Sequence, residues 1–252
     1  MTLEHSLERK LTILAKRETV FRFFTDTSRW EKWWGKGSTV DPRPGGQIRI
    51  LYPNAVEVTG EVLEVAAPER ISFTYGFTSG SPIPAGSSRV TITLAEKGAA
   101  TLLTLVHEFS DAKARDEHVQ GWRYQLSLFS NIVSDEVNAG VADSIDAWLD
   151  SWANADAGKR EETFRRIAAE SVQFRDKYSA LSGMEDLLSH VTAAQKFMPG
   201  VRLERQGEVR HCQGSAFCNW NATANGKAIG TGTTFFTLDA EGRIGAVTGF
   251  WG

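Results

Sequence analysis

The chain has few cysteines, no long apolar run and no large excess of either charge. Its 252 residues include two cysteines, too few for a disulfide framework or a structural zinc site. No apolar run approaches the roughly 20 residues needed to span a bilayer. A net charge of -3 offers no electrostatic footprint to nucleic acid or to an anionic membrane. The sequence therefore predicts no nucleic-acid partner and no membrane partner.

Common catalytic signatures are missing as well. The sequence has no glycine loop for phosphate between a strand and a helix, no His-x-x-x-His or Cys-x-x-Cys pair, and no serine in a nucleophile elbow. The first ten residues alternate charged and apolar side chains, unlike the apolar core of a signal peptide. We therefore expect a cytoplasmic protein with no metal and no cofactor.

Aromatic residues are plentiful and unevenly distributed. Eight Trp and fourteen Phe stand against four Tyr, and Trp30, Trp33 and Trp34 form one cluster. Large rings either fill a core or line a cavity, and composition alone allows both. The cluster therefore either gates a pocket mouth or covers the open end of a sheet.

The first half of the chain reads as one strand, two short helices, a meander of strands and a long helix. Consecutive hairpins impose antiparallel pairing, and the long helix must bury its apolar stripe on one face of the sheet. Such a curved sheet around a helix leaves a cavity between them. The expected strands are residues 6–14, 47–52, 56–65, 70–77, 89–95 and 101–109, and the expected helices 17–24, 28–34 and 115–137.

Several stretches of this half resemble the SRPBCC (START-like) superfamily, and within it the domain named after the activator of heat-shock protein 90 ATPase. The resemblance implies a helix-grip domain over residues 1–138 with a hydrophobic pocket, but no single activity. The matching residues are Glu18-Thr19-Val20-Phe21, Trp33-Trp34, Asp41-Pro42-Arg43-Pro44-Gly45-Gly46, Gly60-Glu61-Val62-Leu63-Glu64-Val65 and Gly121-Trp122.

After a short linker at Asn138-Ala139-Gly140, the second half reads as three helices, one small inserted strand and a four-strand meander. This order resembles the nuclear transport factor 2-like fold in its SnoaL-like branch, which implies a cone-shaped domain over residues 139–252. The fold class is therefore α+β with two domains. The matching residues are Ile145-Asp146-Ala147-Trp148, Phe174-Arg175-Asp176 and Gly183-Met184-Glu185-Asp186-Leu187-Leu188.

Two hairpin signals set the expected register of the last sheet. Gln213-Gly214 and Asn225-Gly226 predict two-residue turns, the first of which puts the two cysteines on opposite faces. Counting outward from the second turn pairs Trp220 with Thr231 and Cys218 with Thr233. The concave face is then expected to carry Thr231, Thr233 and Phe235, and the outer face Phe217, Thr234 and Phe236. Because sheets of this fold often pair back to back, a homodimer through the second domain is expected.

Asp176 and His211 are the candidate acid–base pair, with Tyr178 as a donor to a developing enolate. A carboxylate or histidine in an apolar cone has its pKa shifted toward neutrality and can abstract a proton next to a carbonyl. The alternative is that Asp176 bonds local backbone and His211 is a satisfied core residue. The last eight residues contain no acid, which argues against the arrangement of ketosteroid isomerase.

The remaining candidates are ligand-binding residues. His107 alternates with apolar residues on its strand, so it either faces the first pocket, with Glu61 and Glu64 nearby, or is simply buried. The residues predicted to line the two cups are Trp33, Trp34, Phe73, Tyr75, His107, Phe109, Trp122, Trp148, Trp152, Phe174, Trp220, Thr231, Thr233, Phe235 and Trp251.

The leading hypothesis is a protein that binds a small hydrophobic molecule in one or both apolar cups. The alternative is a cofactor-free cyclase, isomerase or dehydratase that uses Asp176 and His211. A third hypothesis, carried by the family resemblance of the first domain, is a co-chaperone of heat-shock protein 90.

Overall fold

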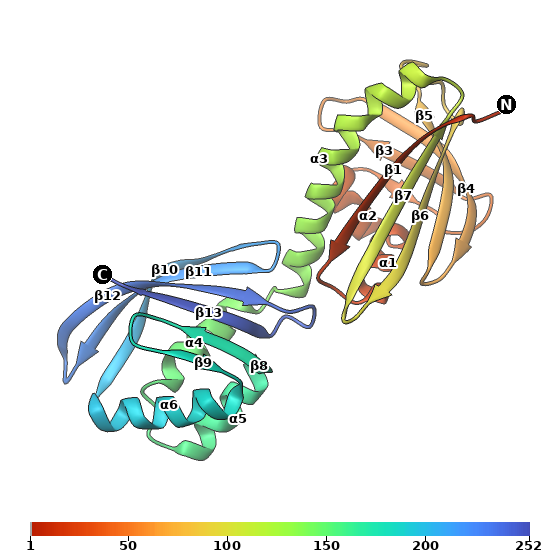
Figure 1. The fold of residues 1–252 in the computed structure, drawn as a ribbon. Coiled ribbons are helices and arrows are strands. Elements are labelled where there is room, and N and C mark those ends of the chain that lie inside the picture. Colours follow the sequence, from red (N-terminus) through yellow and green to blue (C-terminus); the bar gives the residue numbers. More distant parts are fainter. Residues whose placement is uncertain (1) are drawn as a thin grey trace. The chain divides into compact units, whose positions relative to one another are not determined.

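The computed structural model describes residues 2–252 and divides into two compact units, Met1–Ser134 and Asp135–Gly252 (Figure 1). The dividing point lies inside the long helix α3 (Ala112–Val137). The domain boundary after residue 138 stays a prediction.

The first unit is one antiparallel sheet with α3 along one face (Figure 1). Its strand order is β1-β7-β6-β5-β4-β3-β2, so the two ends of the meander are far apart and β1 returns beside β7. This is the predicted helix-grip fold. The elements before α3 are β1 (His5–Ile13), α1 (Arg17–Thr25), α2 (Thr27–Trp34), β2 (Thr39–Val40), β3 (Gln47–Leu51), β4 (Glu57–Ala66), β5 (Arg70–Phe77), β6 (Ser88–Lys97) and β7 (Ala100–Phe109).

Residue patterns explain these elements and their packing. Every second residue of β7 is buried, as expected for a strand with one face on the core. Asp26 caps the N-terminus of α2, and its carboxylate accepts hydrogen bonds from the backbone of Ser28 and Arg29. On α3 the buried apolar stripe includes Trp122, Leu126, Phe129 and Val133. The spacing of three or four residues that predicted this helix therefore also sets its buried face.

The second unit is a mixed sheet with three helices. Its strand order is β10-β11-β12-β13-β8-β9, and only the β13–β8 pair is parallel. With the preceding helices this is the predicted cone-shaped fold of the nuclear transport factor 2-like type. The elements are α4 (Val141–Ser151), α5 (Ala157–Ile167), β8 (Ala168–Arg175), β9 (Ala180–Ser182), α6 (Met184–Phe197), β10 (Val201–Cys212), β11 (Ser215–Ala224), β12 (Lys227–Leu238) and β13 (Ile244–Trp251).

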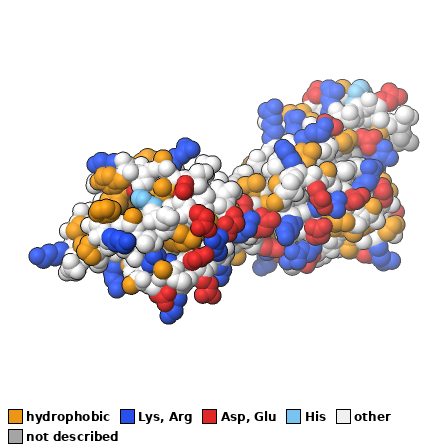
Figure 2. All heavy atoms as spheres, turned by 60° about the horizontal axis from the view of Figure 1, so that its bottom comes forward, with side chains coloured by type: hydrophobic (Ala, Val, Ile, Leu, Met, Phe, Trp, Pro, Cys, Tyr) orange, Lys and Arg blue, Asp and Glu red, His pale blue; other side chains and the backbone are white. Residues whose placement is uncertain are grey.

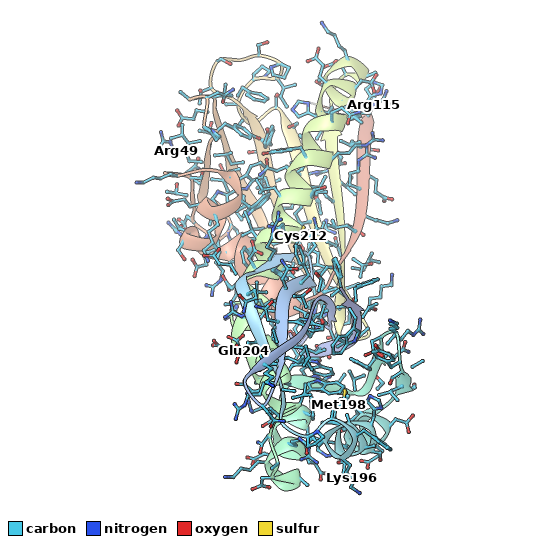
Figure 3. The ribbon with its side chains drawn as sticks, turned by 90° about the vertical axis from the view of Figure 1, so that its left-hand side faces the viewer. Arg49, Arg115, Lys196, Met198, Glu204 and Cys212 are labelled. Carbon is cyan, nitrogen blue, oxygen red and sulfur yellow. The ribbon has the colours of Figure 1, made fainter. Side chains whose placement is uncertain are left out.

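Both predicted hairpin turns are present. Gln213 and Asn225 have φ of 47° and 51°, and each is followed by a glycine of positive φ, the signature of a type I′ turn. Cys212 pairs with Ser215 as predicted. Cys212 is exposed at the end of β10 (Figure 3), whereas Cys218 is buried, and both are free thiols.

The predicted register of β11 and β12 is wrong beyond the second turn. Thr223 pairs with Ala228 but Ala222 pairs with Gly230, so the bulge leaves Ile229 without a partner and half exposed. All later pairs shift by one: Trp220 lies opposite Gly232. Thr234 and Phe236 consequently face the core, whereas Thr231, Thr233 and Phe235 lie on the outer face.

Packing explains why the bulge is needed. A Cβ atom at position 232 would overlap the ring of Trp220 and the backbone oxygen of Phe250. Only glycine therefore fits opposite this buried indole. Without the bulge, a threonine would occupy that place.

Candidate functional site

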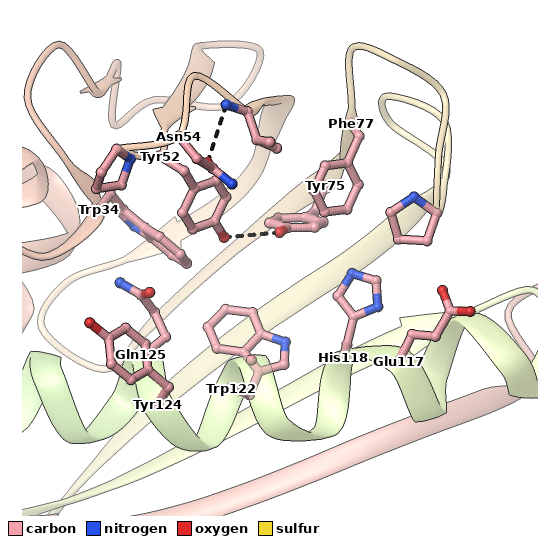
Figure 4. A pocket seen from close by; sticks show the side chains of 14 residues that line it. Trp34, Tyr52, Asn54, Tyr75, Phe77, Glu117, His118, Trp122, Tyr124 and Gln125 are labelled. Carbon is pink, nitrogen blue, oxygen red and sulfur yellow. Dashed lines mark hydrogen bonds between the residues drawn. The ribbon is translucent and has the colours of Figure 1, made fainter.

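The first unit contains a cavity of about 540 Å³ between α3, the loop that joins β3 to β4, and β5 (Figure 4). This volume lies within the range of roughly 300–1,000 Å³ that is usual for small-molecule sites. Its wall is mainly aromatic. The rings that line it are Trp34, Tyr52, Tyr75, Phe77, Trp122 and Tyr124.

The rings hold one another in fixed orientations. Trp34 lies edge-on to both Trp122 and Tyr52, with centroids 5.8 and 5.9 Å apart. Tyr75 is similarly edge-on to Phe77 at 5.8 Å. Edge-to-face contacts of this kind add to the free energy gained by burial. The wall is therefore supported by its own packing as well as by the sheet.

Tyr52 and Tyr75 form the first polar feature of the wall. Their hydroxyl oxygens are 3.2 Å apart, as the dashed line in Figure 4 shows. Burial raises the pKa of Tyr52, and the pKa of Tyr75 lies well above its ordinary value because of burial and the neighbouring phenol. Both groups are neutral near pH 7. Since one hydroxyl donates to the other, one hydroxyl hydrogen is left for a third partner.

His118 is the second polar feature. Its Nδ1 lies 2.7 Å from the backbone oxygen of Ala114, which can only accept, so Nδ1 carries the hydrogen. Burial lowers the pKa of His118, against the opposing effect of this bond, so the imidazole is neutral near pH 7. Its Nε2 lone pair is buried, has no partner among residues 2–252, and belongs to a residue that is 9% exposed.

Trp34 supplies the third polar feature. Its indole Nε1–H is also buried without a protein acceptor, on a residue that is 3% exposed. Buried polar groups are nearly always hydrogen-bonded. Two residues that line the cavity thus carry unpartnered buried atoms, an acceptor on His118 and a donor on Trp34.

His107 lies behind this wall, and its role is structural. It accepts a 2.9 Å hydrogen bond from Nε1 of Trp122, which can only donate, so Nε2 of His107 carries the proton. That Nε2 lies 2.8 Å from Oγ of Ser88, which donates to the backbone oxygen of Tyr75. His107 is fully buried and does not line the cavity. Burial holds its pKa well below 6.5.

The other predicted residues of the first unit divide into two groups. Trp34, Tyr75 and Trp122 line the cavity, whereas Trp33, Phe73 and Phe109 are core residues behind it. Of the two nearby glutamates, both exposed, Glu64 pairs with Arg70 at 2.9 Å.

Sequence reasoning missed His118, Tyr52 and Gln125. The first of these stands at the end of a charged run that reads as a solvated helix start. The sequence nevertheless indicated that His118 and Gln125 are buried, because positions 118, 122 and 125 are spaced by four and three residues, as in the apolar stripe of α3.

The structure does not bring Asp176 and His211 together. Following the paired residues from strand to strand, through β11, β12 and β13, leads from His211 on β10 to Phe174 on β8. Four strand spacings of about 4.8 Å make roughly 19 Å when measured along the sheet, and Asp176 follows the last residue of β8.

Each of the two has local partners instead. One oxygen of Asp176 accepts from the backbone of Tyr178 at 2.8 Å, and the other from Nε1 of Trp251 at 3.2 Å. His211 bonds Asp135 through Nδ1 at 3.0 Å and accepts from the backbone of Gly214 at 3.2 Å. Tyr178 is 69% exposed. The geometry favours the local-bonding alternative for Asp176, whereas His211 is hydrogen-bonded but partly buried rather than a core residue.

The aromatic residues predicted to line the second cup pack mainly on one another. Trp148, Phe174 and Trp220 are core residues, and Trp152 and Trp251 pack against that core. Nε1 of Trp220 donates to Oγ1 of Thr234 at 2.8 Å. A hollow of about 340 Å³ is bordered by Trp220, Trp251, Thr231 and Thr233 among others.

Two further features concern metals and membranes. Within residues 2–252, no group of three or more His, Cys, Asp or Glu side chains is placed to hold a metal ion. None of the helices in this described part of the chain has the length and apolarity that crossing a membrane requires.

Fold and cavity together define a two-domain α+β protein with a ligand-sized cavity in its first unit. Residues 14–134 match the model of the family described as activator of Hsp90 ATPase homolog 1-like protein. The match spans most of the first unit, and the second unit has the order of helices and strands expected of a SnoaL-like fold. None of the curated proteins matches the chain.

Solved structures similar to the chain come from several bacteria. A SnoaL-like family protein of Agrobacterium tumefaciens is 23% identical, with 44% of this chain and 95% of that chain covered and a TM-score of 0.42. Protein MLL2253 of Mesorhizobium loti is 20% identical, with 52% and 97% covered and a TM-score of 0.47. CalU16 of Micromonospora echinospora is 24% identical, with 52% and 77% covered and a TM-score of 0.43. At these similarities, no property of these proteins is transferred to this chain.

Proposed function

We propose that the first unit binds a small, largely apolar molecule in the cavity between α3 and the sheet. The observation that supports this most is the 540 Å³ cavity, whose aromatic wall leaves two buried polar atoms unpartnered. A core that evolved only for stability would fill such a space, because unfilled volume costs contacts. An apolar ligand restores those contacts, and its polar atoms can satisfy the two groups.

Gly121 offers a way to block the cavity without disturbing the helix. It lies on α3, lines the cavity, and has no atom within 4 Å of where its Cβ would be. Leucine at this position projects into the cavity mouth and also raises helix propensity by about 1 kcal/mol. The matched control is Gln120→Leu, because Gln120 is exposed next to it and does not line the cavity.

The experiment is titration of the full-length protein with naphthalene, followed by calorimetry. Wild type and Gln120→Leu should bind with equal affinity, and Gly121→Leu should lose at least about tenfold. Equal binding by Gly121→Leu, or absence of binding to wild type, contradicts the proposal. Native mass spectrometry of the purified protein tests in parallel whether a molecule is retained.

The other functional hypotheses stay predictions. An enzyme that pairs Asp176 with His211 loses its geometric support, because the two lie on separated strands. A role as a co-chaperone of heat-shock protein 90 rests on family resemblance alone. The cytoplasmic location also stays a prediction.

We keep the proposal of a homodimer through the second unit but assign different residues to its interface. Figure 2 shows hydrophobic side chains gathered on the second unit. On the outer sheet face, Phe235 and Phe250 are 47% and 56% exposed, and Phe217 stacks on Phe235 at 5.2 Å. We propose these three rings, rather than Thr234 and Phe236, as the face that a second copy would cover.

A further inference from the structure

The two unpartnered atoms of the cavity specify the chemistry of the ligand's buried end. We infer that the ligand's polar end beside His118 is a neutral hydroxyl group that donates a hydrogen bond to Nε2 of His118, and that a second polar atom of the ligand accepts from Nε1 of Trp34. The inference rests on the proposed function and deepens it, since it selects one class among apolar ligands: alcohols and phenols.

His118 requires a donor because its tautomer is fixed. The bond from Nδ1 to the oxygen of Ala114 leaves Nε2 as a bare acceptor, so a ligand carbonyl or ether oxygen there would face lone pair to lone pair. The side chain is also held in place by rings on two strands. Its centroid lies 4.9 Å from that of Phe109 and 5.9 Å from that of Tyr75.

Trp34 requires an acceptor because an indole N–H can only donate. A second polar atom of the ligand, such as an oxygen, can accept this hydrogen bond. Figure 4 shows Trp34 and His118 at two ends of the same wall, so one ligand atom does not reach both groups.

Charged ligand groups fit the cavity poorly. A carboxylate has no hydrogen to offer Nε2 of His118, and both tyrosines of the wall are neutral, with pKa values raised by burial. An ammonium group would need a buried anion, but the one carboxylate of the lining, Glu117, is exposed. The cavity therefore favours a neutral donor over either ionised group.

The test compares four probes of similar size on the full-length protein by calorimetry: naphthalene, 2-methoxynaphthalene, 2-naphthol and 2-naphthoate. We expect 2-naphthol to bind about tenfold more tightly than naphthalene and 2-methoxynaphthalene, and 2-naphthoate to bind most weakly. In His118→Phe, which keeps a ring of similar shape, naphthalene affinity should persist while the preference for 2-naphthol falls to within about twofold.

A second measurement uses the wild-type protein alone. With 15N-labelled histidine, the Nε2 resonance of His118 should move toward the hydrogen-bonded range when 2-naphthol binds and stay unchanged with 2-methoxynaphthalene. Equal affinity for the four probes, a preference that survives in His118→Phe, or an Nε2 resonance unmoved by bound 2-naphthol overturns the inference. Those results leave apolar binding intact, whereas failure of all four probes to bind overturns the proposed function with it.

Discussion

The buried chain from Trp122 through His107 and Ser88 to Tyr75 makes a sharp prediction for stability. Ser88→Ala removes the acceptor that the described part of the chain provides for Nε2–H of His107, a residue with no solvent exposure. A buried donor left without a partner costs about 1–3 kcal/mol. We therefore expect this substitution to destabilise the first unit by about 2 kcal/mol, although it deletes a single oxygen.

A double-mutant cycle separates this effect from loss of packing. In a His107→Phe background there is no Nε2–H to leave unpaired, so Ser88→Ala should cost only about 0.5–1 kcal/mol for the remaining bond to Tyr75. The coupling between the two positions should then be about 1–2 kcal/mol. Ser127→Ala on the exposed side of α3 removes a similar hydroxyl and serves as the control.

The assay is urea unfolding of the full-length protein, with the transitions of the two units fitted separately. The cycle uses the transition that His107→Phe shifts. If Ser88→Ala costs the same free energy in both backgrounds, the network assigned to His107 is refuted. A cost below about 0.5 kcal/mol in the wild-type background would refute it equally.

Three further predictions concern pH, packing and assembly. Burial holds the pKa of His107 well below 6.5, so the unfolded chain binds a proton at this residue more readily than the folded chain does. The contribution of His107 to stability is therefore complete above about pH 6.5 and declines as the pH falls below that value. Urea midpoints at several pH values test this. Gly232→Ala forces a Cβ against the Trp220 ring and should destabilise the second unit by about 2–4 kcal/mol. The control Gly245→Ala, whose added Cβ would have its nearest atom at 3.5 Å, should cost under about 1 kcal/mol. Equal urea midpoints for the two variants would contradict the close contact between Gly232 and Trp220. Phe235→Ser should give a monomer in solution scattering if the outer sheet face forms a dimer, and an unchanged dimer mass would remove that face from consideration.

Local sequence determined the secondary elements because their signals act over a few residues. Asn225-Gly226 predicted a type I′ turn, since both residues tolerate positive φ, and the structure has it. The stripe at Trp122, Leu126, Phe129 and Val133 predicted both α3 and its buried face. The strand β9 was missed because three residues are too few to show a period.

The tertiary structure alone decided the register of the strands and which distant side chains lie close together. The bulge at Ile229 moves every later side chain of β12 to the opposite face, and it is required by the meeting of Gly232 with the Trp220 ring. Asp176 and His211 are a plausible pair in a list of residues, but four strand spacings separate their positions in the sheet.

The same holds for the two histidines of the first unit. The sequence marks His107 as inward-facing and His118 as part of a charged run, yet the first is fully bonded and the second has a free acceptor in the cavity. What a buried histidine can do depends on which groups reach its two nitrogens, and those groups come from elements distant in the chain. Periodicity therefore determined which residues are buried, while packing decided which of them remain available to a ligand.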